Sequence, residues 1–362
     1  MADRPLEVVQ LTPPGRGALA TLRVEGFGAL QAVAAHFTPR SGRPLGSVAP
    51  SRLVVGRFGG SQGEEVVVRR VCDEALEIHC HAGPAAVGRI EQLLVQSGCR
   101  PLRWQQWVAR QESDPLAAAA RIALAEARTT RTAAILLDQY RGALGRAFQE
   151  IRAALALHQT DLARQRLEAL RAAATVGRHL IRPWRVVLAG PPNVGKSSLL
   201  NALAGYSRAI VHPLPGTTRD AVAAETVLDG WPVELCDTAG LRETSDAVER
   251  AGVQLAGRRI AQADLVVLVF DQSQPWSAAE EALRAARPAA QLVHNKRDLP
   301  PAAGPRPPGL AVSATQGVGV DTLAEAIAGR LVPQPPLAGQ AVPFTESQID
   351  QVDAWLRQLG PS

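Results

Sequence analysis

The chain has few cysteines and few aromatic residues, and no apolar run approaches the length of a membrane span. The four cysteines form no Cys-x-x-Cys pair and no pattern of cysteine and histidine ligands, which argues against disulfides and a structural zinc site. We therefore expect free thiols in a reducing compartment. The first residues are polar and do not resemble a signal peptide, so the sequence predicts a cytoplasmic protein without a membrane partner.

Basic residues are in slight excess but are not clustered. The chain has 39 lysines and arginines against 34 acidic residues, a formal net charge of +5. An excess of this size allows a polyanionic partner such as RNA. The sequence has no arginine-rich tract and no alternation of aromatic and basic residues, so charge alone is a weak argument for RNA. The length of 362 residues suits two or three domains.

Residues 1–115 are predicted to form an α+β domain with antiparallel strands. Short apolar segments alternate with turns rich in glycine and proline, which is typical of such strands. A helical spacing of Ile90, Leu93 and Leu94 predicts a helix over Val87–Ser97. The predicted strands are Val8–Leu11, Ala18–Val24, Arg52–Phe58, Glu65–Val71 and Leu76–Cys80.

Residues 116–182 and the C-terminal residues 334–362 are predicted to be helical. The first segment is rich in strong helix formers and has few breakers, which indicates two or three packed helices ending before Pro183. The second begins with a proline-rich linker and continues as an amphipathic helix over Ser347–Leu359. Thr345 and Gln348 have the spacing of a capping box. We expect this helix to pack on the helices of residues 116–182.

Residues 183–333 alternate apolar strands with helices, which predicts an α/β domain: a mostly parallel sheet with helices on both faces. Ligands of such sheets bind at the carboxyl ends of the strands. The proline- and glycine-rich residues 300–309 are interpreted as a surface loop. The predicted strands are Val186–Ala189, Val233–Cys236, Leu265–Phe270, Ala290–His294 and Leu310–Val312.

A glycine-rich turn with the sequence G-P-P-N-V-G-K-S follows the first of these strands, from Gly190 to Ser197, and leads into a helix-like stretch. Strand, turn and helix in this order are typical of a P-loop, whose backbone N–H groups bind phosphate oxygens. Lys196 is expected to reach the β- and γ-phosphates, and the Ser197 hydroxyl to bind Mg²⁺. The predicted phosphate-binding residues are Asn193, Val194, Gly195, Lys196, Ser197 and Ser198.

Two later segments predict that the base is guanine. Asn295, Lys296 and Asp298 form an N-K-x-D motif after a strand. The Asp298 carboxylate can accept from both N1–H and the 2-amino group of guanine, which adenine does not offer. Asn295 would brace the loop, and Lys296 would pack over the base. After the last strand, one backbone N–H of the tripeptide Ser313, Ala314 and Thr315 is expected to meet guanine O6.

Two further segments have the features of phosphate-sensing switches. Asp237, Thr238, Ala239 and Gly240 end a strand; Asp237 would hold Mg²⁺ through water, and the Gly240 N–H would contact the γ-phosphate. In the segment Pro215–Asp220, Thr218 is the predicted Mg²⁺ ligand and Thr217 the alternative.

Leu241, the residue after Gly240, has an apolar side chain at the position where Ras-like enzymes have a water-orienting glutamine. An apolar side chain cannot orient a nucleophile. Hydrolysis must therefore recruit another group, or be slow.

In this spacing the motifs resemble the TrmE/MnmE family of tRNA-modification GTPases. The stretch from Asp237 to Arg250, with the sequence D-T-A-G-L-R-E-T-S-D-A-V-E-R, is especially similar. So are Leu11–Gly17, near the start, and Leu76–Pro84. The resemblance spans the N-terminal domain and the whole predicted GTPase domain.

This resemblance implies a GTPase domain inserted in a helical domain and preceded by a domain for dimerisation and folate binding. It also implies a homodimer that modifies the wobble uridine of tRNA with a flavoprotein partner, and GTPase domains that meet across the dimer and are activated by K⁺. Asn193 matches the family's K⁺ ligand, and Glu249 the glutamate that orients the attacking water through a second water. The residues predicted to act on the γ-phosphate and the water are Lys196, Thr218, Gly240 and Glu249.

Two departures from the family pattern leave two functions open. The chain has no terminal Cys-x-Gly-Lys, and the stretch Pro101–Leu116 lacks the segment P-G-E-F-T-x-R-A-F-x-N-G-K. The first hypothesis is a K⁺-stimulated GTPase that serves tRNA modification, with folate binding in question. The alternative is a GTP-regulated switch of the Era/Der type that associates with RNA or the ribosome and has lost the modification chemistry.

Overall fold

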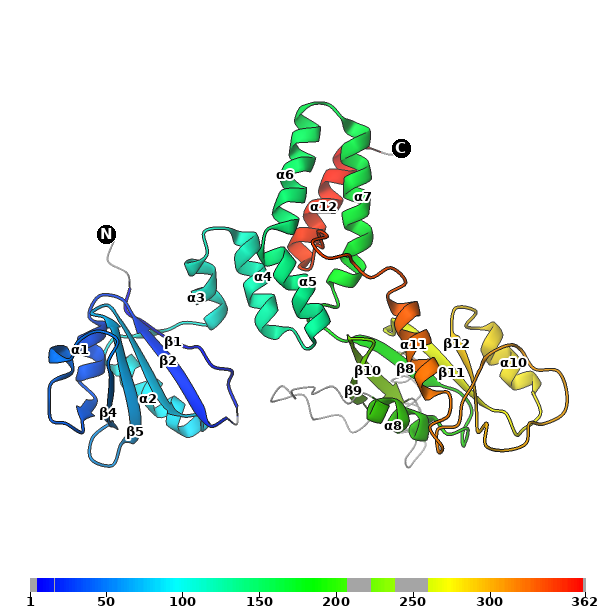
Figure 1. Cartoon of the computed structure of the whole chain (residues 1–362), viewed down its shortest axis with the longest axis horizontal. Coiled ribbons are helices and arrows are strands. Elements are labelled where there is room, and N and C mark those ends of the chain that lie inside the picture. The colour runs from blue at the N-terminus through cyan, green and yellow to red at the C-terminus, as the bar shows by residue number, and fades with distance from the viewer. Residues whose placement is uncertain (1–4, 16, 207–222, 238–259, 361–362) are drawn as a thin grey trace, which may run out of the picture. The chain divides into compact units, whose positions relative to one another are not determined.

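The computed structural model describes residues 5–15, 17–206, 223–237 and 260–360. These residues form two compact units, one of residues 5–115 and one that begins at Leu116 and contains the rest. Figure 1 labels most of the helices and many of the strands of both units. No helix in these ranges is long and apolar enough to cross a membrane.

The first unit is a seven-stranded sheet in the order β3-β4-β5-β6-β2-β1-β7. All neighbours are antiparallel except β1 and β7. The strands alternate buried and exposed residues, so one face of the sheet forms a core with α1 and α2. The elements are β1 (Glu7–Gln10), β2 (Leu19–Glu25), α1 (Ala29–Ala34), β3 (Phe37–Pro39), η1 (Leu45–Ser47), β4 (Leu53–Phe58), β5 (Glu64–Cys72), β6 (Ala75–His81), α2 (Pro84–Gln96), β7 (Arg100–Pro101) and α3 (Trp104–Gln111).

The five strands and the helix predicted for this unit are confirmed to within a few residues. The short strands β3 and β7 were not predicted. They have three and two residues, too few for an alternating pattern, and they form only by pairing at the two edges of a sheet that already exists.

The second unit begins with four helices, where two or three were predicted. The breaks between them are only two or three residues long in an alanine-rich sequence: Thr129 caps the N-terminus of α5, and Gly142 precedes α6 with a φ of 88°. Such breaks leave little trace in the apolar pattern. The helices are α4 (Pro115–Glu126), α5 (Thr130–Tyr140), α6 (Ala143–Ala156) and α7 (Thr160–Gly177).

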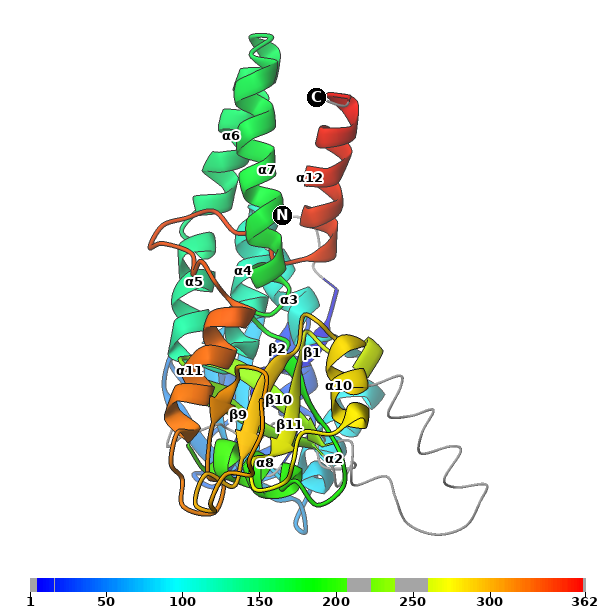
Figure 2. The same ribbon diagram turned by 90° about the vertical axis from the view of Figure 1, so that its right-hand side faces the viewer.

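A fifth helix, α12 (Glu346–Gln358), lies against α7 although almost 170 residues separate them (Figure 2). The predicted capping box is present: the Thr345 hydroxyl accepts from the Gln348 amide, and the Gln348 side chain accepts from the Thr345 amide. The ring of Trp355 meets that of Phe148 of α6 edge-on, with 5.2 Å between centroids. The apolar stripe of α12 is thus buried on the helices of the same unit.

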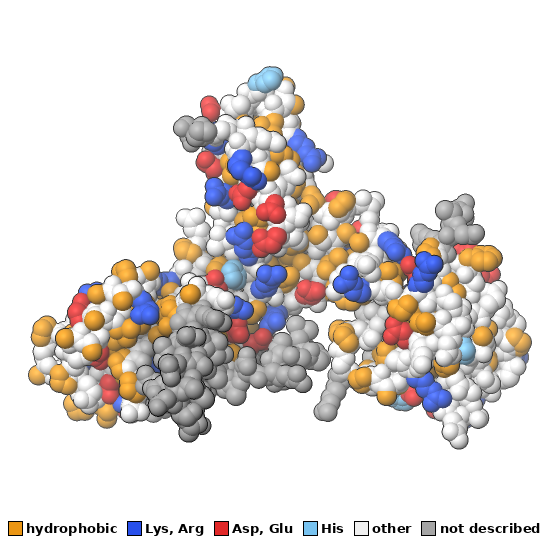
Figure 3. Space-filling model, turned by 180° about the vertical axis from the view of Figure 1, so that it is seen from behind, with side chains coloured by type: hydrophobic (Ala, Val, Ile, Leu, Met, Phe, Trp, Pro, Cys, Tyr) orange, Lys and Arg blue, Asp and Glu red, His pale blue; other side chains and the backbone are white. Residues whose placement is uncertain are grey.

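Charges of both signs are interspersed on this helical part, as the face in Figure 3 shows. Three ion pairs connect its helices: Arg166 with Glu150, Arg171 with Asp353, and Arg178 with Glu346. All these side chains are largely exposed, so each pair adds little stability. The surface agrees with a sequence in which basic residues are not clustered.

The rest of the second unit is a six-stranded sheet in the order β13-β12-β11-β8-β10-β9, parallel except for the edge strand β9. Apolar residues of α8 and α11 are buried on one face, and Leu283 of α10 packs on the other, which confirms the predicted α/β class. The elements are β8 (Trp184–Ala189), α8 (Lys196–Tyr206), β9 (Ala223–Leu228), β10 (Trp231–Asp237), β11 (Leu265–Asp271), α10 (Ala278–Ala285), β12 (Gln291–Asn295), β13 (Leu310–Ala311) and α11 (Val320–Leu331).

The sheet is joined to the helices at the turn between β9 and β10. The Thr129 hydroxyl donates to the carbonyl oxygen of Gly230 at 2.7 Å, and Arg131 pairs with Asp229 at 2.9 Å. The Arg131 guanidinium lies 5.3 Å from the centre of the buried Trp231 ring. Helices and sheet therefore share one continuous core.

Gly177, the last residue of α7, allows the segment before α12 to pass close to the helix. A Cβ there would lie 1.8 Å from the carbonyl oxygen of Pro343. We expect Gly177→Ala to force the segment away and to lower the free energy of unfolding by about 1–3 kcal/mol. Gly145→Ala in α6 is the matched control, since its Cβ would meet only ordinary contacts. Thermal unfolding of both variants measures the effect; equal melting temperatures would contradict this packing.

Candidate nucleotide site

The loop between β8 and α8 has the backbone of a phosphate nest. Gly190, Asn193 and Gly195 have positive φ values of 150°, 63° and 91°. A Cβ on Gly190 would lie 2.1 Å from the Val269 carbonyl oxygen, and one on Gly195 would lie 2.4 Å from Asn295 Nδ2. Glycine is required at both positions because the loop packs directly against the ends of β11 and β12.

Lys196, the first residue of α8, is turned back into this loop. Its Nζ donates to the carbonyl oxygens of Gly190 at 3.1 Å and Pro191 at 2.7 Å, and the residue is only 5% exposed. A buried ammonium next to a helix N-terminus makes the loop attractive to anions.

Ser197 and Asp237 come together from α8 and from the carboxyl end of β10. The Ser197 hydroxyl donates to Asp237 Oδ2 at 2.5 Å, and Asp237 is 5% exposed. A hydroxyl and a carboxylate side by side are the oxygen ligands that Mg²⁺ prefers in proteins. The two predicted Mg²⁺ ligands in the described ranges therefore suit this ion.

Asn295 connects the phosphate loop to the loop after β13. Its Nδ2 donates to the carbonyl oxygen of Val194 at 2.8 Å, and its Oδ1 accepts from the backbone N–H of Ala314 at 3.0 Å. The side chain is buried, with 2% of the residue exposed. One amide side chain thus fixes the distance between the two loops.

Asp298 is held by the same second loop. The Ser313 hydroxyl donates to Asp298 Oδ1 at 2.5 Å and lies 3.1 Å from the Thr315 hydroxyl. Ser313 is fully buried, whereas Asp298 is exposed. The buried serine therefore orients a carboxylate that faces solvent.

Lys296 is paired with Asp271, a residue that the sequence analysis missed. Lys296 Nζ lies 2.7 Å from Asp271 Oδ2, and Asp271 Oδ1 accepts from the amide and the hydroxyl of Ser273. Burial alone would raise the pKa of the Asp271 carboxyl, but the hydrogen bonds and positive charge of Lys296, together with Ser273, outweigh burial and lower it. The available signal was an acidic residue at the end of a predicted strand, at the edge where the motifs gather.

Several predicted site residues lie outside the described ranges. They are the segment 215–220 with Thr217 and Thr218, the residues Thr238, Ala239 and Gly240 after Asp237, Leu241, and Glu249. The structure brings the other predicted residues to one edge of the sheet, at the carboxyl ends of β8, β10 and β12 and after β13.

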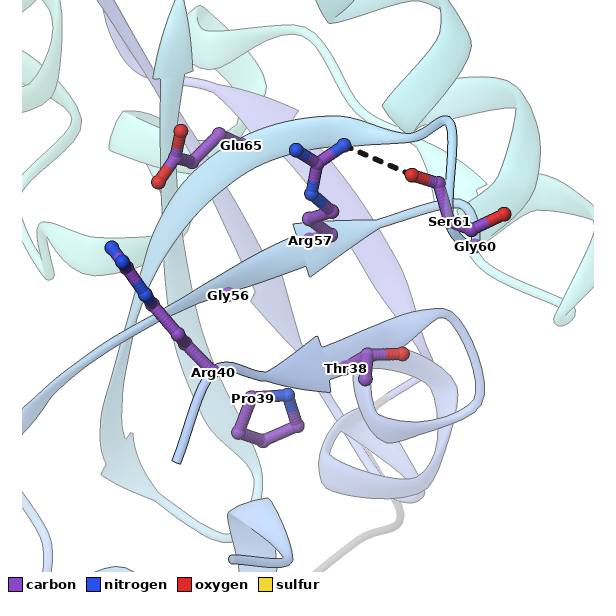
Figure 4. Close-up of a pocket in the computed structure, with 8 residues that line it drawn as sticks. All are labelled: Thr38, Pro39, Arg40, Gly56, Arg57, Gly60, Ser61 and Glu65. Atoms are coloured by element: carbon purple, nitrogen blue, oxygen red, sulfur yellow. Dashed lines mark hydrogen bonds between the residues drawn. The ribbon is translucent and has the colours of Figure 1, made fainter. Parts of the chain in front are cut away.

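The first unit has a separate cavity of about 540 Å³. It lies beside strands β3, β4 and β5, on the side of the sheet that β3 borders (Figure 4). Two arginines, Arg40 and Arg57, line it, and Arg57 donates to the carbonyl oxygen of Ser61 at 2.9 Å. Its lining residues come from 38–65 alone, so it has no residue in common with the site on the second sheet.

The pairing of Asp271 predicts a pH-dependent contribution to stability. Its folded-state pKa lies below the unfolded value, so the carboxylate adds stability above about pH 4 and loses this contribution as the pH falls through the folded-state pKa. Asp271→Asn should lower the free energy of unfolding by about 2 kcal/mol near neutral pH. Urea unfolding of both proteins from neutral to acidic pH should show the difference shrinking. A difference that is constant with pH would contradict the pairing.

Comparisons with known proteins agree with this site. Residues 185–296 match the family model described as "50S ribosome-binding GTPase". The tRNA modification GTPase MnmE of Thermus thermophilus is 35% identical, over 94% of this chain and 85% of that protein. The MnmE protein of Synechococcus sp. (strain JA-2-3B'a(2-13)) is 33% identical, over 99% of this chain and 88% of that protein. The MnmE protein of Chloroflexus aurantiacus is 36% identical, over 89% of this chain and 80% of that protein. Identity at this level along most of both chains shows that the chain belongs to the MnmE (TrmE) family of tRNA modification GTPases.

Proposed function

We propose that this chain binds GTP and hydrolyses it to GDP and phosphate in the service of tRNA modification. The observation that carries the proposal is the position of Asn295. Its two hydrogen bonds join a phosphate-binding loop to the loop that holds Asp298, so that one ligand can reach both. Membership of the MnmE family supports the same activity.

The phosphates would lie in the nest that runs from Asn193 to Ser198. The Lys196 ammonium is already inside this loop, where it bonds two neutral carbonyl oxygens. Phosphate oxygens are charged acceptors and form stronger bonds with an ammonium, so GTP would draw Lys196 toward the β- and γ-phosphates.

The guanine would be read by the loops after β12 and β13. Asp298, oriented by Ser313, accepts from N1–H and the 2-amino group, while Lys296 packs over the base. A backbone N–H of residues 313–315 would donate to O6; because those of Ser313 and Ala314 already donate to Val318 and Asn295, we assign this bond to Thr315. Adenine would leave these polar groups unpaired, which makes the site selective for guanine.

Ser197 and Asp237 are the described residues that suit Mg²⁺. We propose Thr218, the threonine predicted from the sequence, as a further ligand. When bound, Mg²⁺ neutralises charge that develops on the phosphate oxygens. Ser197 and Asp237 are held in register by α8 and β10, and their hydrogen bond keeps both oxygens at the edge of the phosphate loop. Gly240 would donate its backbone N–H to the γ-phosphate.

Hydrolysis would depend on K⁺ and on contact between the GTPase domains of a homodimer. Asn193 lies in the phosphate loop with a left-handed φ of 63°, and its side-chain oxygen is the K⁺ ligand that we propose. When bound there, K⁺ would supply the positive charge that an arginine finger supplies in other GTPases. Glu249 would orient the attacking water, because Leu241 cannot.

The tRNA role that we propose is the modification of the wobble uridine, carried out with a flavoprotein partner. The match to a family model described by ribosome binding favours a second candidate, a GTP-regulated switch on RNA or the ribosome. Nucleoside analysis of tRNA from a deletion strain separates the two. Loss of the modified wobble nucleoside would support the role in tRNA modification. An unchanged nucleoside profile would refute that role and support the switch on RNA or the ribosome.

Asp298→Asn tests guanine recognition. An asparagine amide donates where the carboxylate accepts, so the affinity for GDP should fall on the order of 100-fold while that for xanthosine diphosphate rises. Calorimetric titration with Mg²⁺ measures both. Asp321→Asn, an exposed residue of α11, is the control and should bind GDP as the wild type does. Unchanged GDP affinity in Asp298→Asn would refute this assignment.

The ion dependence tests the role of Asn193. GTP hydrolysis by the wild type should be at least about tenfold faster in KCl than in NaCl at equal ionic strength, because only K⁺ would fill the site. Asn193→Ala should keep the slower rate in both salts. Equal wild-type rates in KCl and NaCl would remove Asn193 from this role.

A further inference from the structure

The proline-rich segment 300–309 is bonded to residues 271–274, at the end of β11, by the Arg306 side chain and by the Ala302 amide, which donates to the carbonyl oxygen of Gln272 at 2.9 Å. The Arg306 guanidinium donates to the carbonyl oxygens of Gln274 at 2.6 Å, Gln272 at 3.1 Å and Asp271 at 3.2 Å. A planar group with five N–H donors can serve three carbonyls at once, which the single ammonium of a lysine cannot do in the same geometry. Arg306 is therefore the one side chain of the segment 300–309 that bonds three carbonyls of residues 271–274, and it supports their path.

His294, next to Asn295 on β12, completes this contact. Its Nε2 lies 2.9 Å from the carbonyl oxygen of Pro307, and its Nδ1 lies 3.3 Å from Arg306 Nη1. A carbonyl only accepts and a guanidinium only donates, so Nε2 carries the hydrogen and Nδ1 accepts. Burial, with the nearby charge of Arg306, lowers the pKa of His294 and agrees with a neutral ring. The ring thus holds the segment without adding charge.

Residues 271–274 in turn hold the loop of residues 295–299, which carries Lys296 and Asp298. The Asp271 carboxylate pairs with Lys296 at 2.7 Å. The Gln272 amide donates to the carbonyl oxygen of Asn295 at 3.0 Å, and its side chain donates to that of Leu299 at 3.3 Å. Both ends of the loop that carries Asp298 are therefore tied to a segment that Arg306 fixes.

We infer that Arg306 is a positioning residue for guanine recognition: it holds residues 271–274, and these hold Lys296 and the loop of Asp298. Arg306 acts through these residues and does not touch the nucleotide. The inference rests on the proposed function and extends it to a segment that the sequence suggested was only a surface loop.

Arg306→Ala tests this role, with Arg330→Ala as the matched control. Arg330 also bonds a backbone carbonyl, that of Ala289, but near the opposite end of β12. Titration of the full chain with GDP and inosine diphosphate in Mg²⁺ is the measurement. Inosine lacks the 2-amino group, so it makes one bond fewer to Asp298. In Arg306→Ala we expect the Kd for GDP to rise about tenfold and the preference for GDP over inosine diphosphate to shrink. Arg330→Ala should stay within about twofold of the wild type.

Turnover separates positioning from general damage. In Arg306→Ala, KM for GTP should rise while kcat at saturating GTP stays near that of the wild type, because the bonds of Arg306 go to residues 271–274 and His294, which support the loop of Asp298. The inference would be overturned if a folded Arg306→Ala prefers GDP over inosine diphosphate as strongly as the wild type does. It would also be overturned if Arg306→Ala and Arg330→Ala weaken GDP binding equally. Should Arg306→Ala fail to fold, Arg306→Lys keeps the charge, and wild-type preference in that variant overturns it too. A wild type that binds ADP as well as GDP would refute the proposed function, and this role with it.

Discussion

The site depends on one buried amide side chain. Asn295 donates to the carbonyl oxygen of Val194 and accepts from the amide of Ala314, so it joins the phosphate loop to the loop that orients Asp298. Because this side chain is buried, losing it would leave polar backbone groups unpaired at a cost of about 1–3 kcal/mol each. The close contact also explains Gly195, since any Cβ there would displace the Asn295 amide.

The parallel sheet makes this contact possible. Strands β8, β10, β11 and β12 run in the same direction, so their carboxyl ends deliver Gly190, Asp237, Asp271 and Asn295 to one edge. A second layer of contacts then supports the groups placed there. Ser313 orients Asp298, Asp271 holds Lys296, and Arg306 holds the segment that contains Asp271.

Much of the fold follows from local pattern. The apolar strands of both sheets, the helix of residues 84–96 and the capping box of Thr345 and Gln348 were predictable because each depends on residues close together in the sequence. Strand β7 was missed because it forms only by pairing with β1, more than 90 residues earlier, and β3 because it has only three residues. Strand β9 was also missed, although it pairs with its neighbour β10 through a two-residue turn at Asp229 and Gly230. The extra helix before residue 182 was missed because breaks of only two or three residues separate alanine-rich neighbours.

The candidate site divides in the same way. The motifs of residues 190–198 and 295–298 were recognisable because fixed spacing carries their chemistry. Asp271 and Arg306 belong to no motif, and their roles come from partners 25 and 35 residues away. The segment 300–309 was interpreted as a surface loop, since proline and glycine predict irregular backbone but not what an arginine within it will bind.

Amide hydrogen exchange of the wild-type chain with Mg²⁺ tests most directly whether the two loops form one site. We predict that GDP protects the backbone N–H groups of residues 193–198 and of residues 313–315 in the same experiment, and that ADP at the same concentration protects neither. Protection of only one loop by GDP, or equal protection by ADP, would contradict the account.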